Sequence, residues 1–184
     1  MNDTPGEREL NQFFKRWHQE TKRSLALMRT LPHDRYDFRP DPGGRSLGEL
    51  AWHIAEVDGF FSTSLVAGAF RPGVPIPGLE RPATIEAIAP GYERVHADAV
   101  ARLEPHLRPE HLDRDTPFIG GRMLKLRDIL WVAMLHHHIH HRGQLSLMNR
   151  LAGGVTPEIY GFTREQVAAR RAAQAPPAPD TPPR

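Results

Sequence analysis

The sequence predicts an all-α protein, a four-helix bundle with long crossover connections. Apolar residues recur every three or four positions in four long segments, proline and glycine gather between these segments, and neither strand alternation nor an internal repeat competes. The 184 residues, 39% of them hydrophobic, are enough for a single core. We expect one domain over residues 1–172 and a disordered, proline-rich tail over residues 173–184.

The first two helices are predicted at residues 7–31 and 46–68. The first has an amphipathic period and ends before Pro32; its apolar residues are Leu10, Phe13, Phe14, Trp17, Leu25 and Met28. The second begins with the signature of a capping box, because Ser46 stands three residues before Glu49. Its apolar face consists of Leu47, Leu50, Ala51, Ile54, Val57, Phe61 and Leu65.

Two further long helices are predicted at residues 84–106 and 123–152. An irregular connection precedes them, because residues 71–82 contain four prolines and two glycines. At ~1.5 Å per residue the last helix would be about 45 Å long and would span the whole domain. The residues that end it are Gly153, Gly154 and Pro157. A short helix is predicted at residues 163–173.

Composition excludes several classes of function. The chain has no cysteine, so a disulfide scaffold, thiolate metal ligands and a cysteine nucleophile are all excluded. Its net charge is +2 and its basic residues form no stripe, so we expect no nucleic-acid partner. We find neither a signal peptide nor an apolar run long enough to span a membrane, and we expect a cytoplasmic protein.

The segment LHHHIHHRGQL, residues 135–145, holds five of the 11 histidines. The fourth helix has an apolar stripe whose residues are three or four positions apart. If this stripe continues, His137, His141 and Gln144 lie on the inward face, and His138 points in another direction. Two imidazoles one helical turn apart can bind one divalent ion. The alternative is that they are core histidines with hydrogen-bond partners of their own.

A third metal ligand should come from a facing helix. His53, beside the apolar face of the second helix, is the best candidate. The competing candidates are His18, His96 and His106. Spacing alone does not choose among the four.

Three stretches together carry a family resemblance: RPDPGGRSLGELAWHIAE, HHIHHRGQL and LAGGVTPEIYG. With them the chain resembles the DinB-like family, the DinB/YfiT superfamily, from about residue 8 to residue 162. The resemblance implies a four-helix bundle in which His53, His137 and His141 hold a divalent metal. It implies no DNA polymerase activity. Relatives include thiol-dependent S-transferases and a mycothiol-dependent isomerase, and members of this kind often pair as homodimers.

Three histidine ligands leave a coordination position open, as in catalytic zinc sites. Zinc is the expected metal, with nickel or iron as alternatives. The sequence therefore predicts a metal-dependent enzyme with a small-molecule substrate, either an S-transferase that uses a low-molecular-weight thiol or a hydrolase. Any thiol must come from a cofactor, because the chain has none. The alternative is a non-catalytic stress-response or interaction protein with a structural metal.

Other residues of the two histidine segments have predicted roles near the metal. Glu56 and His140 are candidates for general acid or base, although a solvated helix face would also explain them. Arg142 would pair with an acidic group of a ligand or with a neighbouring helix, and Gln144 would orient a ligand histidine. Gly143 would permit close helix packing.

Trp131 and Arg127 are candidates for the seam of the expected homodimer. Trp131 could instead pack under a loop within one chain.

Overall fold

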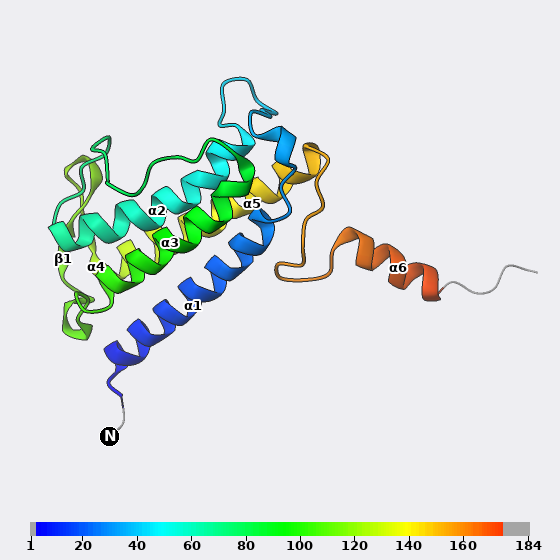
Figure 1. Cartoon of the computed structure of the whole chain (residues 1–184). Coiled ribbons are helices and arrows are strands. Elements are labelled where there is room, and N and C mark those ends of the chain that lie inside the picture. Colours follow the sequence, from blue (N-terminus) through cyan, green and yellow to red (C-terminus); the bar gives the residue numbers. More distant parts are fainter. Residues whose placement is uncertain (1–2, 175–184) are drawn as a thin grey trace, which may run out of the picture.

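The computed structural model describes residues 3–174, which are mostly helical. Four long helical segments lie side by side (Figure 1): α1 (Pro5–Met28), α2 (Leu47–Ala67), α3 (Ile85–Leu103), and a continuous run of α4 (Leu126–Asp128), the π-helix η4 (Ile129–His136) and α5 (His137–Leu151). Helix α2 contacts both α3 and α5, and α1 contacts the same two helices. Helix α5 therefore has neighbours on two sides.

Short elements fill the connections. They are the 3₁₀ turns η1 (His33–Arg35), η2 (Pro109–His111) and η3 (Ile119–Gly121), the strands β1 (Asp115–Pro117) and β2 (Met123–Lys125), and the helix α6 (Arg164–Gln174). Figure 1 shows α6 projecting away from the other helices, and none of its residues is buried. It extends two residues into the predicted tail, and residues 175–184 lie outside the described residues.

Two helices begin with the same capping device. In α2 the Ser46 hydroxyl accepts from the backbone N–H of Glu49, whose carboxylate accepts from the backbone N–H of Ser46. The predicted capping box is thus confirmed, and Thr4 and Glu7 repeat it at α1. Because each box satisfies two unpaired backbone donors, it fixes the residue at which the helix starts.

The region before the fourth helix differs from the prediction. Residues 123–125 form strand β2, which pairs antiparallel with β1, and the helix begins at Leu126. The connection between the strands contains Gly120 and Gly121 at φ values of 71° and 75°, a conformation that residues with a Cβ avoid. A turn of this kind closes a β-hairpin. Helical periodicity alone assigns residues 123–125 to the fourth helix.

The apolar core has two parts, each drawn from several helices. One lies around Trp52, Ile54, Ile88 and Tyr92. The other lies around Phe13, Trp17, Phe61 and Leu130. Among residues 3–174, no helix is long and apolar enough to cross a membrane.

Candidate metal centre

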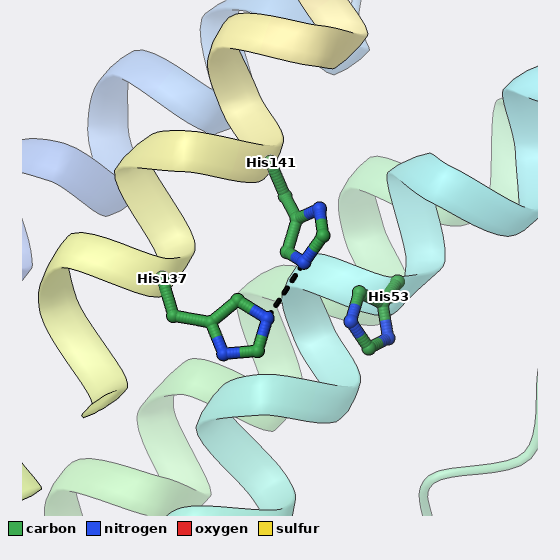
Figure 2. Close-up of side chains that lie close together, drawn as sticks. All are labelled: His53, His137 and His141. Atoms are coloured by element: carbon green, nitrogen blue, oxygen red, sulfur yellow. Dashed lines mark hydrogen bonds between the residues drawn. The ribbon is translucent and has the colours of Figure 1, made fainter.

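Three histidines from two helices meet between α2 and α5. His53 comes from α2, and His137 and His141 come from successive turns of α5 (Figure 2). One nitrogen of each ring lies within 4.8 Å of a nitrogen of each of the other two. Among the described residues, this is the one group of three or more potential ligands with that geometry. The structure thus brings together the three residues that the family resemblance assigned to the metal.

Helix α2 is held in place by close packing that two of its glycines allow. A Cβ on Gly48 would overlap the ring of Tyr36, whose hydroxyl donates to the Pro82 carbonyl. A Cβ on Gly59 would lie 2.8 Å from Leu79, whose carbonyl accepts from the indole of Trp52. The connection at residues 71–82 is therefore packed directly on the helix that carries His53.

Acceptor groups set the orientation of two of the three rings. His53 Nδ1 lies 3.0 Å from Glu56 Oε2, and His141 Nδ1 lies 2.7 Å from Gln144 Oε1. A carboxylate or an amide oxygen accepts only, so both Nδ1 atoms carry the hydrogen. In the neutral rings the Nε2 lone pairs are then free for a cation.

His137 and His141 approach each other through these second nitrogens. Their Nε2 atoms are 2.6 Å apart (Figure 2). Two imidazole lone pairs at that distance would repel, so in this arrangement one of the two nitrogens donates a hydrogen to the other. The donor set, three imidazoles directed to one place, fits zinc, nickel or iron.

The rings are kept in the form that binds metals. Burial lowers the pKa of His141 to about 4; the hydrogen bond to Gln144 opposes this effect, and the neighbouring rings of His53 and His137 add to it. Burial also lowers the pKa of His137, and the proximity of His53 adds to that shift. At neutral pH the rings of His137 and His141 are therefore neutral.

Glu56 supports His53 and also borders open space. Burial raises the pKa of its carboxyl, but the hydrogen bond from His53 and the charges of nearby basic groups outweigh burial, so the pKa lies below its ordinary value. Arg81 Nη2 lies 3.7 Å from its other oxygen. Glu56 is thus an anion fixed on the far side of His53.

A pocket of about 900 Å³ opens beside the histidines. His53, His137 and Glu56 contribute to its wall, which is otherwise largely apolar. The apolar residues are Val57, Phe60, Phe61, Val74, Ile76, Leu79, Phe118, Ile119, Val132 and Ala133. Its size is that of a site for a small organic molecule.

Comparison with known proteins agrees with this geometry. The sequence matches the model of the DinB family over residues 1–175. This chain belongs to the DinB family. It is 27% identical over 161 residues to the protein of Bacillus subtilis (strain 168) named uncharacterized protein YrdA, covering 86% of this chain and 92% of YrdA.

Two crystal structures of DinB-like proteins have similar folds. One, from Bacillus cereus ATCC 10987, has a TM-score of 0.67 at 26% identity and covers 80% of this chain and 95% of its own. The other, YjoA from Bacillus subtilis, has a TM-score of 0.64 at 25% identity and covers 81% of this chain and 96% of its own. The fold of this DinB-family protein is thus shared over nearly the whole of both relatives.

The remaining predicted residues of the histidine segment lie in different surroundings. His140 is exposed, with its ring centroid 5.1 Å from that of His141. Arg142 is buried, and its Nη1 lies 2.6 Å from Glu20 Oε2, so it pairs with a neighbouring helix and lies outside the pocket lining. The prediction for Gly143 is wrong, because a Cβ there would meet nothing within 4 Å.

The position of Gln144 agrees only in part with the prediction from helical periodicity. It was placed on the inward stripe, yet its side chain is exposed. Its amide oxygen nevertheless reaches His141 Nδ1, which is the contact expected of a residue that orients a ligand.

A second group, buried around Asp58, was not predicted from the sequence. This carboxylate accepts from Trp17 Nε1 and Tyr92 Oη, both at 3.0 Å, and lies 2.9 Å from His96 Nδ1. Burial raises its pKa, but the interactions with His138 and His96 outweigh burial and bring the pKa to about 2. The one signal in the sequence is an aspartate inside the apolar run of α2.

His138 belongs to this second group, contrary to the expectation that it turns away from the core. It is fully buried, and its Nε2 lies 2.7 Å from Ser24 Oγ. The phase of α5 placed it opposite the His137 stripe, but the far side of α5 is covered by α1. Both faces of this helix are therefore interior.

The competing third ligands lie elsewhere in this DinB-family protein. His18 Nδ1 is 3.0 Å from His96 Nε2, so these two residues pair with each other. His106 lines a separate pocket near Leu107 and His111.

Trp131 and Arg127 make their contacts within the chain. The Trp131 indole donates to Glu9 at 3.3 Å, and Arg127 pairs with Glu9 and Asp113. This favours the alternative of packing within one chain for Trp131.

Proposed function

We propose that this DinB-family protein is a metal-dependent enzyme in which His53, His137 and His141 hold one divalent cation. Zinc is the metal that we expect first. The observation that carries the proposal is the convergence of three ring nitrogens within 4.8 Å at the wall of a pocket of about 900 Å³. A structural zinc is normally closed by four protein ligands. Here the described residues offer a group of three.

The residues of the chain have distinct tasks in this proposal. Glu56 and Gln144 hold the hydrogens of His53 and His141 and so direct the ligand nitrogens. When bound, the cation would supply Lewis acidity and would lower the pKa of a further group bound to it. The apolar wall around Phe60 and Phe61 restricts water and strengthens electrostatic interactions at the site.

The reaction is either transfer to a low-molecular-weight thiol or hydrolysis. The chain contains no cysteine, so a thiol nucleophile has to enter the pocket from outside. Glu56 borders the pocket and is a candidate to exchange a proton with such a nucleophile, whereas His140 is exposed. We assign to this protein the four-helix bundle architecture of the family.

Metal content tests this proposal. After reconstitution with zinc, nickel or iron(II), mass spectrometry should find about one ion per chain in the wild type and in the matched control His136→Ala, whose side chain is exposed. His141→Ala should lose the ion. Absence of metal from the reconstituted wild type would overturn the proposal.

Activity assays on the same samples separate the two reactions. Loss of glutathione or cysteine thiol in the presence of 1-chloro-2,4-dinitrobenzene would indicate transfer, and release of nitrophenolate from a nitrophenyl ester would indicate hydrolysis. Either activity should depend on the metal. Stable metal binding with neither reaction, together with unfolding on chelation, would favour the non-catalytic alternative.

A further inference from the structure

The pocket beside the three histidines has a wall that the metal centre alone does not explain. Val74, Ile119 and Val132 are large apolar residues with exposed fractions of 57%, 36% and 56%, and all three line this pocket. They come from the 71–82 connection, from the hairpin and from η4. Apolar surface gathered around one concavity is typical of a binding site for an organic molecule.

One positively charged side chain at the same pocket has no partner among the described residues. Arg45 lines the pocket, yet it forms no ion pair or hydrogen bond with residues 3–174. Its neighbours differ in this respect, because Arg39 pairs with Glu49, and Arg81 pairs with Glu49 and Glu56. The carboxylates of this region are thus already engaged by other arginines.

The acidic residues of the lining do not compete for Arg45. Glu56 accepts from His53, and Glu80 Oε1 accepts from the backbone N–H of Gly78 at 3.2 Å. The charge of Arg45 is nevertheless felt inside the site. Burial is the largest influence on the pKa of Glu56 and of His137, and the charge of Arg45 acts to lower both.

We infer that the pocket takes a small carboxylic acid with an apolar, ring-sized body, whose carboxylate is bound by Arg45 while its reactive end lies at the histidine group. Arg45 is then a residue that determines specificity. A guanidinium suits this task because it binds a carboxylate through two parallel hydrogen bonds. The inference rests on the proposed function, since it names the class of substrate for that metal centre.

The test compares two probes of equal shape. 1-Naphthaleneacetate and its neutral amide, 1-naphthaleneacetamide, are titrated into metal-loaded protein while their fluorescence is followed. In the wild type the acid should bind about tenfold more tightly than the amide, the size of a charge-assisted hydrogen bond. Arg45→Gln should abolish this preference and leave amide binding unchanged.

Two further variants locate the effect. Arg171→Gln removes an exposed arginine from α6, outside the pocket lining, and should keep the preference for the acid. Val132→Glu places a carboxylate in the pocket wall and should weaken binding of both probes. Circular dichroism of each variant should match the wild type, because the three replaced side chains are all exposed.

The outcomes distinguish this inference from the proposed function. If the protein holds metal but shows no preference for the acid, or keeps that preference in Arg45→Gln, the inference is overturned and the proposed function stands. A preference that disappears on chelation and persists in Arg45→Gln assigns the carboxylate to the metal, which also overturns it. If the protein holds no metal, the proposed function fails, whatever the probes show.

Discussion

This protein contains two neighbouring groups of histidines, one beside a pocket and the other in the buried core. In one, the rings of His53, His137 and His141 direct nitrogens toward one another beside a pocket. In the other, His96 lies 2.9 Å from the buried carboxylate of Asp58, and His138 lies 3.7 Å from it. Successive residues of α5, His137 and His138, belong to different groups.

The position of the carboxylate accounts for this difference. Asp58 stands at the centre of the second group, where its oxygens accept from a tryptophan and a tyrosine as well as lying against the histidines. Such a group is complete without a metal. In the first group the carboxylate of Glu56 lies behind His53, so the centre holds ring nitrogens alone. An arrangement of this kind is compatible with a bound divalent cation.

Removing the central anion should have the largest effect on stability. Asp58→Asn leaves the ring nitrogen of His96 and the hydroxyl of Tyr92 without their charged acceptor in a fully buried site. The free energy of unfolding should fall by about 1–3 kcal/mol, the cost of leaving a buried polar group without its hydrogen-bond partner. Urea unfolding of the metal-free protein measures this change.

The matched control is Asp98→Asn, an exposed aspartate on α3. Its stability should stay within about 0.5 kcal/mol of the wild type. Metal content of Asp58→Asn, measured under conditions in which it is folded, should be unchanged. Wild-type stability in Asp58→Asn would contradict the view that this anion organises the second group.

The two groups should lose stability in different ranges of pH. The folded-state pKa of His141, about 4, lies below the ordinary value of 6.5, so the unfolded chain takes up this proton first and stability falls as the pH drops from 6.5 towards 4. For Asp58 the folded-state pKa of about 2 lies below 3.8, so its contribution is present above pH 3.8 and is lost as the pH falls through 2.

Urea unfolding of metal-free protein between pH 3 and 7 checks the upper range. His141→Gln should flatten the pH dependence there, because the titrating ring is gone. Asp58→Asn should be less stable at every pH and keep that slope. An unchanged slope in His141→Gln would mean that other groups produce it.

The smallest expected effect concerns the residue that orients His141. Gln144→Leu removes the acceptor for His141 Nδ1 and leaves all three ligands in place. Metal affinity should fall about tenfold. Competition with a chelating dye measures it, with Gln12→Leu, an exposed glutamine on α1, as the control. Equal affinity in both variants would remove Gln144 from the site.

The helices could be predicted because their signals are local. Ser46 and Glu49 mark the start of α2, and the apolar period of residues 7–31 locates α1 to within three residues at each end. Periodicity could not reveal strand β2, because its three residues are held by pairing with Asp115–Pro117 and not by a pattern of their own. Short pairings of this kind depend on contacts that the chain makes only when folded.

The site was predictable in part for the same reason. Helical spacing identified His137 and His141, and the family resemblance supplied His53 from another helix. The burial of His138 could not be derived, because it depends on α1 covering the second side of α5. The role of Asp58 also escaped, since its partners Trp17, Tyr92 and His96 come from two other helices.

The π-helix η4 has a consequence for the length of this part of the chain. Its eight residues, Ile129–His136, end directly before His137, the first residue of α5. A π turn holds more residues than an α turn, because its hydrogen bonds join residues five apart. A regular α-helix over the same eight residues, at about 100° per residue, would therefore turn His137 further around the helix axis relative to Leu126. It would keep the histidines of α5 in their present direction only with about one residue fewer in this segment.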